Sequence, residues 1–267
     1  MHEISPATPS ANQHRRLENY RDLLLILLQK EIKVRYKNNV LGYLWSVGNP
    51  LAFALVYFFA FKVIMRVQIE AYPLVLLAGL FPWQWFANSV NSASSVFVSR
   101  ASIIKKVNFP RYIIPLSVLL NHAVHFCFCL PIIVGLLMVY QKAPYWGWIL
   151  GLPLQMGIQF MLLYGIALTL SSLNLFVRDI EPIASILTQF TFFFTPIVFT
   201  EDLIPQQFSA LVYLNPVASL MINWRHLLVD GRLNGMYVAL SLGYAVLFAG
   251  VGVWIYRRLE HRFAEVV

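Results

Sequence analysis

The acidic side chains of this sequence stand mainly in polar segments between apolar runs, and this placement limits the chemistry that they can perform. Two pairs are close together in the sequence, Asp179 with Glu181 and Glu201 with Asp202. Paired carboxylates can act as general acid and general base, for example in glycosyl transfer on a lipid carrier. No carboxylate pair lies within an apolar run, and neither an HExxH motif nor another metal-ligand pattern is present. We therefore predict no metal site, and an intramembrane glycosyltransferase remains an alternative that rests on the loop acids alone.

Two histidines, His122 and His125, stand inside an apolar run. An ion-coupled secondary carrier normally places ionisable groups at mid-membrane, so this pair is either a proton relay or a pair bonded within a helix bundle. The sequence lacks the G-x-x-x-x-G-K-[ST] loop that binds nucleotide phosphates. If ATP drives transport, a separate subunit must therefore bind the ATP and Mg²⁺, and this chain binds no cofactor itself.

Two polar segments are candidate docking sites for such a subunit. Residues 99–111, SRASIIKKVNFPR, carry four bases and no acid, with apolar residues between the bases, and 178–182 reads RDIEP. The alternative is that both are ordinary basic loops on the cytoplasmic side. The candidate docking residues are Ile104, Lys105, Lys106, Asn108, Phe109, Pro110, Arg111, Arg178, Asp179 and Glu181.

Aromatic residues recur in three of the apolar runs. Sugar rings stack on aromatic faces through their C–H groups, so such residues can line a polysaccharide path. Core packing and belts at the membrane surface are the other reasons for aromatics at these positions. The candidate path residues are Trp45, Phe53, Tyr57, Phe81, Trp83, Trp85, Phe86, Phe190 and Phe193.

The composition identifies the elements that must position these residues. The 267 residues are 59% hydrophobic and 12% charged, with a mean hydropathy of +0.65, whereas soluble domains carry about 25% charged residues. We therefore predict an all-α polytopic membrane protein. The net charge of +8 comes from bases beside apolar runs, which favours anionic lipid headgroups over nucleic acid as the partner.

The apolar runs predict one transmembrane domain, at 17–267, after a disordered cytoplasmic tail at 1–16. The distribution of Lys and Arg predicts that both termini are cytoplasmic. The six predicted spans lie at about 42–62, 72–98, 112–140, 146–175, 183–200 and 234–256.

Residues 17–40 predict an amphipathic helix on the membrane surface. Leu25, Leu28 and Ile32 share one face, and bases occupy another. The apolar stretch at 23–28 is too short to cross a core that needs about 20 residues. The bases are Lys30, Lys33, Arg35 and Lys37.

Residues 203–230 are open to two interpretations. The run from Leu203 to Trp224 is uncharged and long enough to be a seventh span. Pro205, Asn215 and Pro216 argue against a helix that faces lipid. We predict a re-entrant hairpin on the outer side.

Several motifs in order resemble one known family. They are VLGYLWSVGNPL, FPWQWF, IIKKVNFPRYIIPLS, NLFVRDIEPI, FFFTPIVF and LNPVASLMINWRHLLVDG. From about residue 17 to 258, the sequence resembles the permease subunit of type-2 ABC exporters for O-antigen, capsule and teichoic acid.

The resemblance implies a homodimer with two ATP-binding subunits in the bacterial inner membrane. Its cargo would be a lipid-linked polysaccharide, most simply O-antigen on undecaprenyl pyrophosphate. By resemblance, the coupling helix maps to 101–111, the interface helix to 17–40 and the re-entrant helices to 203–230. The path would run between spans 1, 2 and 5. The bases at 30–37 either guide the pyrophosphate or anchor the helix to anionic lipid.

Overall fold

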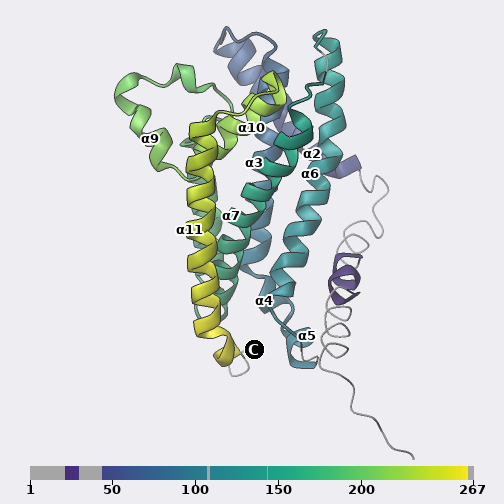
Figure 1. The fold of residues 1–267 in the computed structure, drawn as a ribbon, viewed down its shortest axis with the longest axis vertical. Coiled ribbons are helices and arrows are strands. Elements are labelled where there is room, and N and C mark those ends of the chain that lie inside the picture. Colours follow the sequence, from purple (N-terminus) through teal and green to yellow (C-terminus); the bar gives the residue numbers. More distant parts are fainter. Residues whose placement is uncertain (1–21, 30–43, 107–108, 143, 264–267) are drawn as a thin grey trace, which may run out of the picture.

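The structure, a computed structural model, describes residues 22–29, 44–106, 109–142 and 144–263. These residues form helices and connecting turns, with no strand among them. Three of the described helices are long and apolar enough to cross a membrane: α6 (Ile113–Val139), α7 (Trp148–Phe176), and α11 (Gly235–Leu259) with its last turn. They run along the long axis of the molecule (Figure 1). The predicted all-α membrane class is thus confirmed for the described part of the chain.

The other predicted spans correspond to helices of more varied shape. α2 (Leu44–Tyr57) continues as a π-helix over Phe58–Ile64, and α3 (Tyr72–Ser94) is followed by the short α4 (Val96–Ser99) and α5 (Ala101–Lys106). α8 (Ile180–Phe193) ends well before the predicted position near residue 200. At 1.5 Å per residue its 14 residues extend about 21 Å, less than the roughly 30 Å of a bilayer core. Pro196, which has no backbone N–H to donate, lies just beyond its end.

Only part of the predicted surface helix can be compared with the structure. Residues 22–29 are helical, with Leu27 buried and Ile26 exposed. The tail at 1–16 and the four bases Lys30, Lys33, Arg35 and Lys37 lie outside the described residues.

The chain from 201 to 230 is broken into short helices. Two 3₁₀ turns, Glu201–Leu203 and Gln206–Phe208, precede α9 (Ser209–Leu214) and α10 (Ala218–Asp230). These residues therefore do not form a straight seventh span. α9 stands away from the bundle, whereas α10 lies among α3, α7 and α11 (Figure 1).

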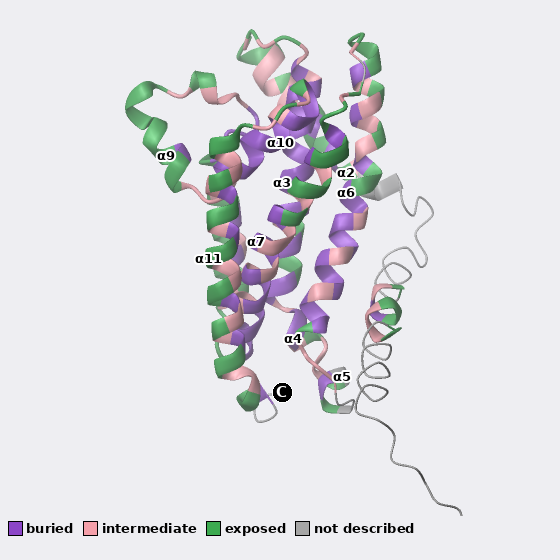
Figure 2. Ribbon diagram, viewed as in Figure 1, coloured by how far each residue is buried: buried purple, intermediate pink, exposed green. Residues whose placement is uncertain are grey.

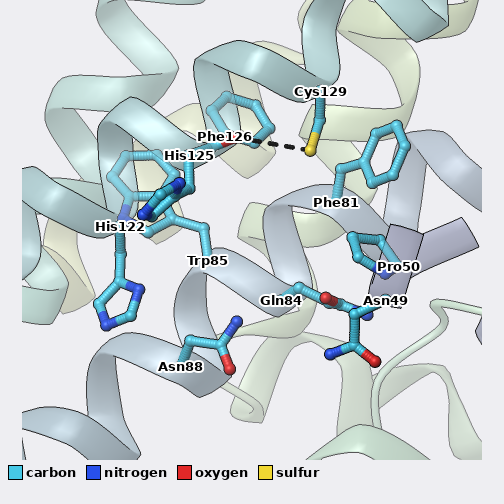
Figure 3. Close-up of a pocket in the computed structure, with 10 residues that line it drawn as sticks. All are labelled: Asn49, Pro50, Phe81, Gln84, Trp85, Asn88, His122, His125, Phe126 and Cys129. Atoms are coloured by element: carbon cyan, nitrogen blue, oxygen red, sulfur yellow. Dashed lines mark hydrogen bonds between the residues drawn. The ribbon is translucent and has the colours of Figure 1, made fainter. Parts of the chain in front are cut away.

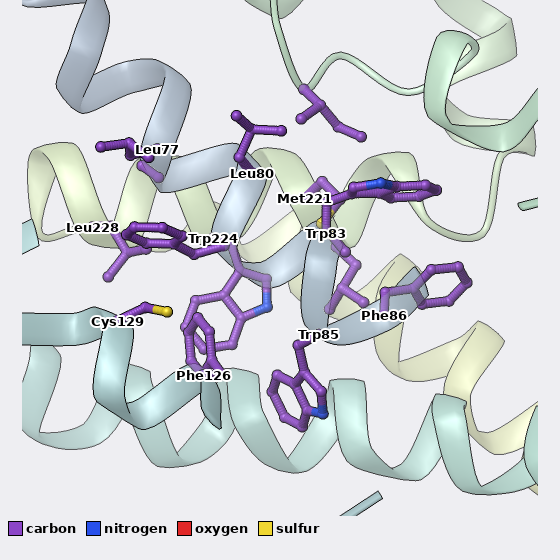
Figure 4. Close-up of a cluster of buried hydrophobic side chains, with 14 of the residues drawn as sticks. Leu77, Leu80, Trp83, Trp85, Phe86, Phe126, Cys129, Met221, Trp224 and Leu228 are labelled. Carbon is purple, nitrogen blue, oxygen red and sulfur yellow. The ribbon is translucent and has the colours of Figure 1, made fainter. Parts of the chain in front are cut away.

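The core lies where α3, α6, α7 and α10 meet, and Figure 2 shows buried residues concentrated there. Trp224 of α10, Phe126 of α6 and the α3 tryptophans pack together in this region (Figure 4). Two buried glutamines of α7 supply hydrogen bonds: Gln155 donates to the Leu220 carbonyl and Gln159 to the Pro82 carbonyl, both at 3.0 Å. Gln159 also accepts the indole N–H of Trp224. α7 is thus bonded to both α3 and α10.

Two glycines allow α7 and α11 to touch through their backbones. A Cβ on Gly252 would overlap the backbone of Gly165, and a Cβ on Gly165 would overlap the backbone at Phe248. A Cβ on Gly250 or Gly243 of α11 would meet nothing within 4 Å. Small residues at helix contacts in membranes permit this kind of close packing.

We expect Gly252→Ala to separate α7 from α11 and to destabilise the chain by about 1–3 kcal/mol. Gly250→Ala is the matched control, because it adds the same methyl to the same helix in open space and raises helix propensity. The yield of monodisperse protein in detergent and its thermal unfolding midpoint measure both effects. Equal behaviour of the two variants would contradict the close packing.

Candidate functional site

A cavity of about 470 Å³ lies between α2, α3 and α8 and combines aromatic rings with side-chain amides. Its volume falls within the roughly 300–1,000 Å³ of small-molecule sites. The rings are Phe53, Tyr57, Trp83, Phe192 and Phe193. The amides are Asn49, Gln84, Asn88, Asn91 and Gln189. Aromatic faces suit the C–H faces of sugar rings, and amides can donate to and accept from hydroxyl groups.

Helical spacing brings these side chains to one place. On α3, Gln84, Asn88 and Asn91 stand at i, i+4 and i+7, which is one face of a helix. Asn49, Phe53 and Tyr57 follow the same rule on α2. Thr188 and Gln189 with Phe192 and Phe193 form the contribution of α8.

Phe192 joins the three helices at the wall of the cavity. Its ring lies 5.5 Å from that of Tyr57 on α2 and 5.5 Å from that of Trp83 on α3, measured between centroids. The candidate path residues predicted from the sequence on this helix were Phe190 and Phe193, and Phe192 was not among them. Phe190 is 58% exposed and does not line the cavity, whereas Phe193 does.

The predicted path aromatics therefore divide into two groups. Phe53, Tyr57, Trp83 and Phe193 line the cavity. Phe81, Trp85 and Phe86 are buried and belong to the core cluster. The side chain of Trp45 lies outside the described residues.

The sequence reasoning missed the amides, although a signal for them was present. Gln84, Asn88 and Asn91 recur at helical spacing within an otherwise apolar run. Polar groups on one face of a spanning helix indicate that this face meets protein or water.

A second, smaller cavity of about 50 Å³ adjoins the first and shares Asn49, Gln84 and Asn88 with it. Figure 3 shows its lining, which includes His122 and His125 of α6. His122 Nε2 lies 3.1 Å from the hydroxyl of Ser92 on α3, so this histidine makes a hydrogen bond between helices. This geometry fits the interpretation of a histidine bonded within the bundle.

The candidate docking residues gather at the end of the bundle that carries α5. Lys105 is exposed, Ile104 is buried, and Phe109 packs against the same apolar cluster as Ile104. Arg111 donates from Nη1 to the Glu260 carbonyl at 2.8 Å, so its side chain is engaged within the chain. The backbone of Asn108 and the side chains of Lys106 and Asn108 lie outside the described residues.

The second docking segment is exposed. Arg178, Asp179 and Glu181 all present accessible side chains between α7 and the first turn of α8. Phe176, at the end of α7, contacts the ring of Phe263 just after α11, with centroids 6.3 Å apart. Phe263 in turn lies beside Arg111. The structure thus brings both predicted segments toward one end of the bundle.

A charged cluster lies near the other end, around α10. Arg225 is 4% exposed and bonds to Glu201 Oε2 at 3.1 Å and to the Pro196 carbonyl. His226 Nε2 lies 2.6 Å from Glu201 Oε1. This hydrogen bond to Glu201 raises the pKa of His226 above its ordinary value of 6.5, although partial burial acts against it. Burial acts to raise the pKa of Glu201, but the His226 hydrogen bond and the Arg225 charge outweigh it and hold that pKa below 4.5.

These shifts predict the pH range in which the cluster is strongest. Because the pKa of His226 is raised in the folded state, its contribution is complete below about pH 6.5 and is lost as pH rises through the folded value. Because the pKa of Glu201 is lowered, its contribution is complete above about pH 4.5 and is lost as pH falls further. The cluster therefore stabilises the fold most between these two limits.

We expect His226→Gln to cost about 1 kcal/mol near pH 6 and progressively less as pH rises through the raised pKa of the wild-type histidine, because the histidine then loses its charge. Thermal unfolding midpoints in detergent across this range measure the difference. His261→Gln, at an exposed position beyond α11, is the control. A penalty for His226→Gln that stays constant with pH would contradict the ion pair.

Comparison with known proteins places the chain in a family. Residues 22–229 match the family described as ABC-2 type transporter. The chain is 44% identical over 246 residues to the O-antigen export system permease protein RfbA of Klebsiella pneumoniae, which covers 92% of this chain and 95% of that protein. It is 33% identical over 258 residues to the protein of the same name in Myxococcus xanthus, and the match covers 95% of this chain and 98% of that protein. It is 24% identical over 244 residues to the polysialic acid transport protein KpsM of Escherichia coli, and the match covers 88% of this chain and 92% of that protein. The chain therefore belongs to the ABC-2 type transporter family.

Proposed function

We propose that this chain is the membrane-spanning subunit of an ATP-driven exporter that moves a lipid-linked polysaccharide outward across the bacterial inner membrane, with O-antigen as the cargo. The observation that carries the proposal is the 44% identity to an O-antigen export permease along 92% of the chain. The cavity between α2, α3 and α8 supports it, because its rings and amides are the groups that sugars need.

The cavity suits a cargo that must slide. Each ring or amide contact with a sugar is weak, and the amides can exchange one hydroxyl for the next without a change in charge. The described lining contains no Asp, Glu, His, Lys or Arg, so it offers no charged site that would hold one sugar in place. Asn49, Gln84 and Gln189 can therefore guide successive residues of the glycan past Tyr57 and Phe192.

The proposed topology has six crossings with both termini cytoplasmic. α2 with its π-helix, α3 with α4, α6, α7, α8 with the following loop, and α11 make the crossings. The segment 201–230 lies at the end opposite α5 (Figure 1), as a re-entrant element on the outer side would. Two copies would form a homodimer in which the α2–α3–α8 cavities border a common path.

Energy enters through two ATP-binding subunits, which hold ATP and Mg²⁺. They dock on segments 101–111 and 178–182, where Lys105, Arg178 and Glu181 are exposed. The bases at 30–37 are outside the described residues, and the sequence predicts that they are on the cytoplasmic side. There they either guide the pyrophosphate of the lipid carrier or bind anionic lipid.

The function is tested by complementation of a strain that lacks this chain. We expect Asn88→Leu and Tyr57→Ala to lower surface O-antigen by about 10-fold or more with normal membrane levels of the protein, because each removes a proposed sugar contact at an exposed or partly buried position. Lipopolysaccharide gels and immunoblots measure the two quantities.

Leu187→Ala is the control for these variants. Leu187 is 59% exposed and does not line the cavity, and it lies on the same helix as Gln189, about 200° around the axis. Normal export by the Asn88 and Tyr57 variants would exclude the α2–α3–α8 cavity from the path. Absence of O-antigen in cells that carry the wild-type chain would refute the function itself.

Docking is tested by copurification. We expect Lys105→Glu combined with Arg178→Glu to reduce recovery of the ATP-binding subunit by about 10-fold, because both side chains are exposed at the proposed contact and the change reverses their charge. Arg232→Glu, an exposed base just after α10, is the matched control. Full recovery of the ATP-binding subunit with the double variant would place its binding site elsewhere.

A further inference from the structure

The last described turn, at the end of α11, is followed by a residue whose burial is unusual for its position. Phe263 is 0% exposed, although Arg257, Arg258, His261 and Arg262 around it are exposed. It follows the 3₁₀ turn Glu260–Arg262 that ends α11. The proposed path does not use Phe263, and the end of α11 that precedes it lies at the opposite end of the bundle from α10 (Figure 1).

Rings from three helices enclose Phe263. The ring centroids of Phe97 on α4, Tyr256 on α11 and Phe176 at the end of α7 lie 5.3, 5.9 and 6.3 Å away. Phe97, Tyr256 and Phe263, together with Ile104 of α5, belong to a buried apolar cluster separate from the main core. Phe176 borders this cluster through its ring contact with Phe263. We call Phe263 and its three ring neighbours the terminal aromatic cluster.

Arg111 connects the cluster to the segment that follows α5. Its guanidinium carbon lies 5.7 Å from the centre of the Phe263 ring, within range of a cation–π interaction. Its Nη1 donates to the Glu260 carbonyl at 2.8 Å. That carbonyl lies just after α11, and it also accepts the backbone N–H of Phe263. Segment 101–111 is thus attached to the end of α11 by the Arg111 side chain, which makes both contacts.

We propose that Phe263 is a positioning residue for energy coupling. It joins segment 101–111 to the ends of α7 and α11, so that a displacement of this segment moves both helices and is not absorbed in the loop. The proposal rests on the proposed function, in which the ATP-binding subunit docks on segment 101–111. The alternative is that Phe263 only plugs the apolar end of the bundle, and the two roles predict different kinetics.

The test uses the full chain coexpressed with its ATP-binding subunit in a strain that lacks both. Three quantities are measured: the amount of assembled complex, ATP hydrolysis by the purified complex in lipid nanodiscs, and surface O-antigen. We expect Phe263→Ala to retain at least about half of the assembly and hydrolysis while lowering export about 10-fold, which raises the ATP used per glycan. Phe263→Leu, which restores apolar volume, should recover export to within about three-fold of wild type.

Two further variants make the result decisive. Trp254→Ala removes an aromatic ring from an exposed position on the same helix and should leave all three quantities unchanged. Phe97→Ala removes the ring that contacts Phe263 from the α4 side and should uncouple hydrolysis from export as Phe263→Ala does, so it replaces that variant if Phe263→Ala fails to accumulate.

Equal losses of hydrolysis and export in the Phe263 and Phe97 variants would overturn the proposal, because they indicate a defect of folding or docking alone. Normal export by both variants would overturn it as well. A wild-type chain that copurifies with no ATP-binding subunit would instead refute the proposed function, and this proposal with it.

Discussion

Polar groups in an apolar solvent must find partners inside the protein, and the arrangement of this bundle follows from that constraint. Hydrocarbon gives little hydrophobic force between helices, so close packing and hydrogen bonds must hold them together. Gln155 and Gln159 of α7 supply such hydrogen bonds, since they bond to α10 and α3 across the most buried part of the molecule. Together with the bond from Trp148 to the Leu227 carbonyl, they fix α10, which is too short to cross a membrane, among longer helices.

The same constraint identifies the site. α3 is buried on most of its surface, yet Asn88 and Asn91 remain exposed on one face. Lipid cannot satisfy such a face, so it must meet water, glycan or protein. The helix therefore has lower apolarity than α6, α7 or α11, which are the described helices that qualify as spans by length and composition alone. A helix that lines a hydrophilic path carries polar side chains on the face toward the path.

The limits of helices that depend on local composition could be predicted from the sequence. The limits that tertiary contacts determine could not. α6 and α7 begin and end within a few residues of the predicted 112–140 and 146–175, because long apolar runs fix their limits. The end of α8 at Phe193 was not predicted. Its continuation is held by Tyr72, which donates to the Val198 carbonyl at 2.9 Å, and by Arg225, which bonds to Pro196.

The candidate site shows the same division. Four of the predicted path aromatics line the cavity, because helical spacing and aromatic type could be read directly. Whether Trp85 faces the path or the core depends on the rotation of α3 against α6, and its ring stacks on Phe126 of α6, with centroids 5.2 Å apart. Arg111 was predicted from charge alone, and its bond to Glu260, 149 positions later in the chain, has no local signal.

α7 makes contacts at both ends of the bundle, so it can transmit a movement from one end to the other. At one end its Trp148 donates to the Leu227 carbonyl of α10 at 2.7 Å, and at the other its Phe176 meets Phe263. Between them, Gly165 lies against Gly252 of α11, so the two helices have little room to slide independently. A movement that begins at α5 would therefore reach α10 through a packed pair of helices more than through the aromatic cavity. In the proposed function, the walls of the α2–α3–α8 cavity then change their separation while their rings and amides keep the orientation that sugars require.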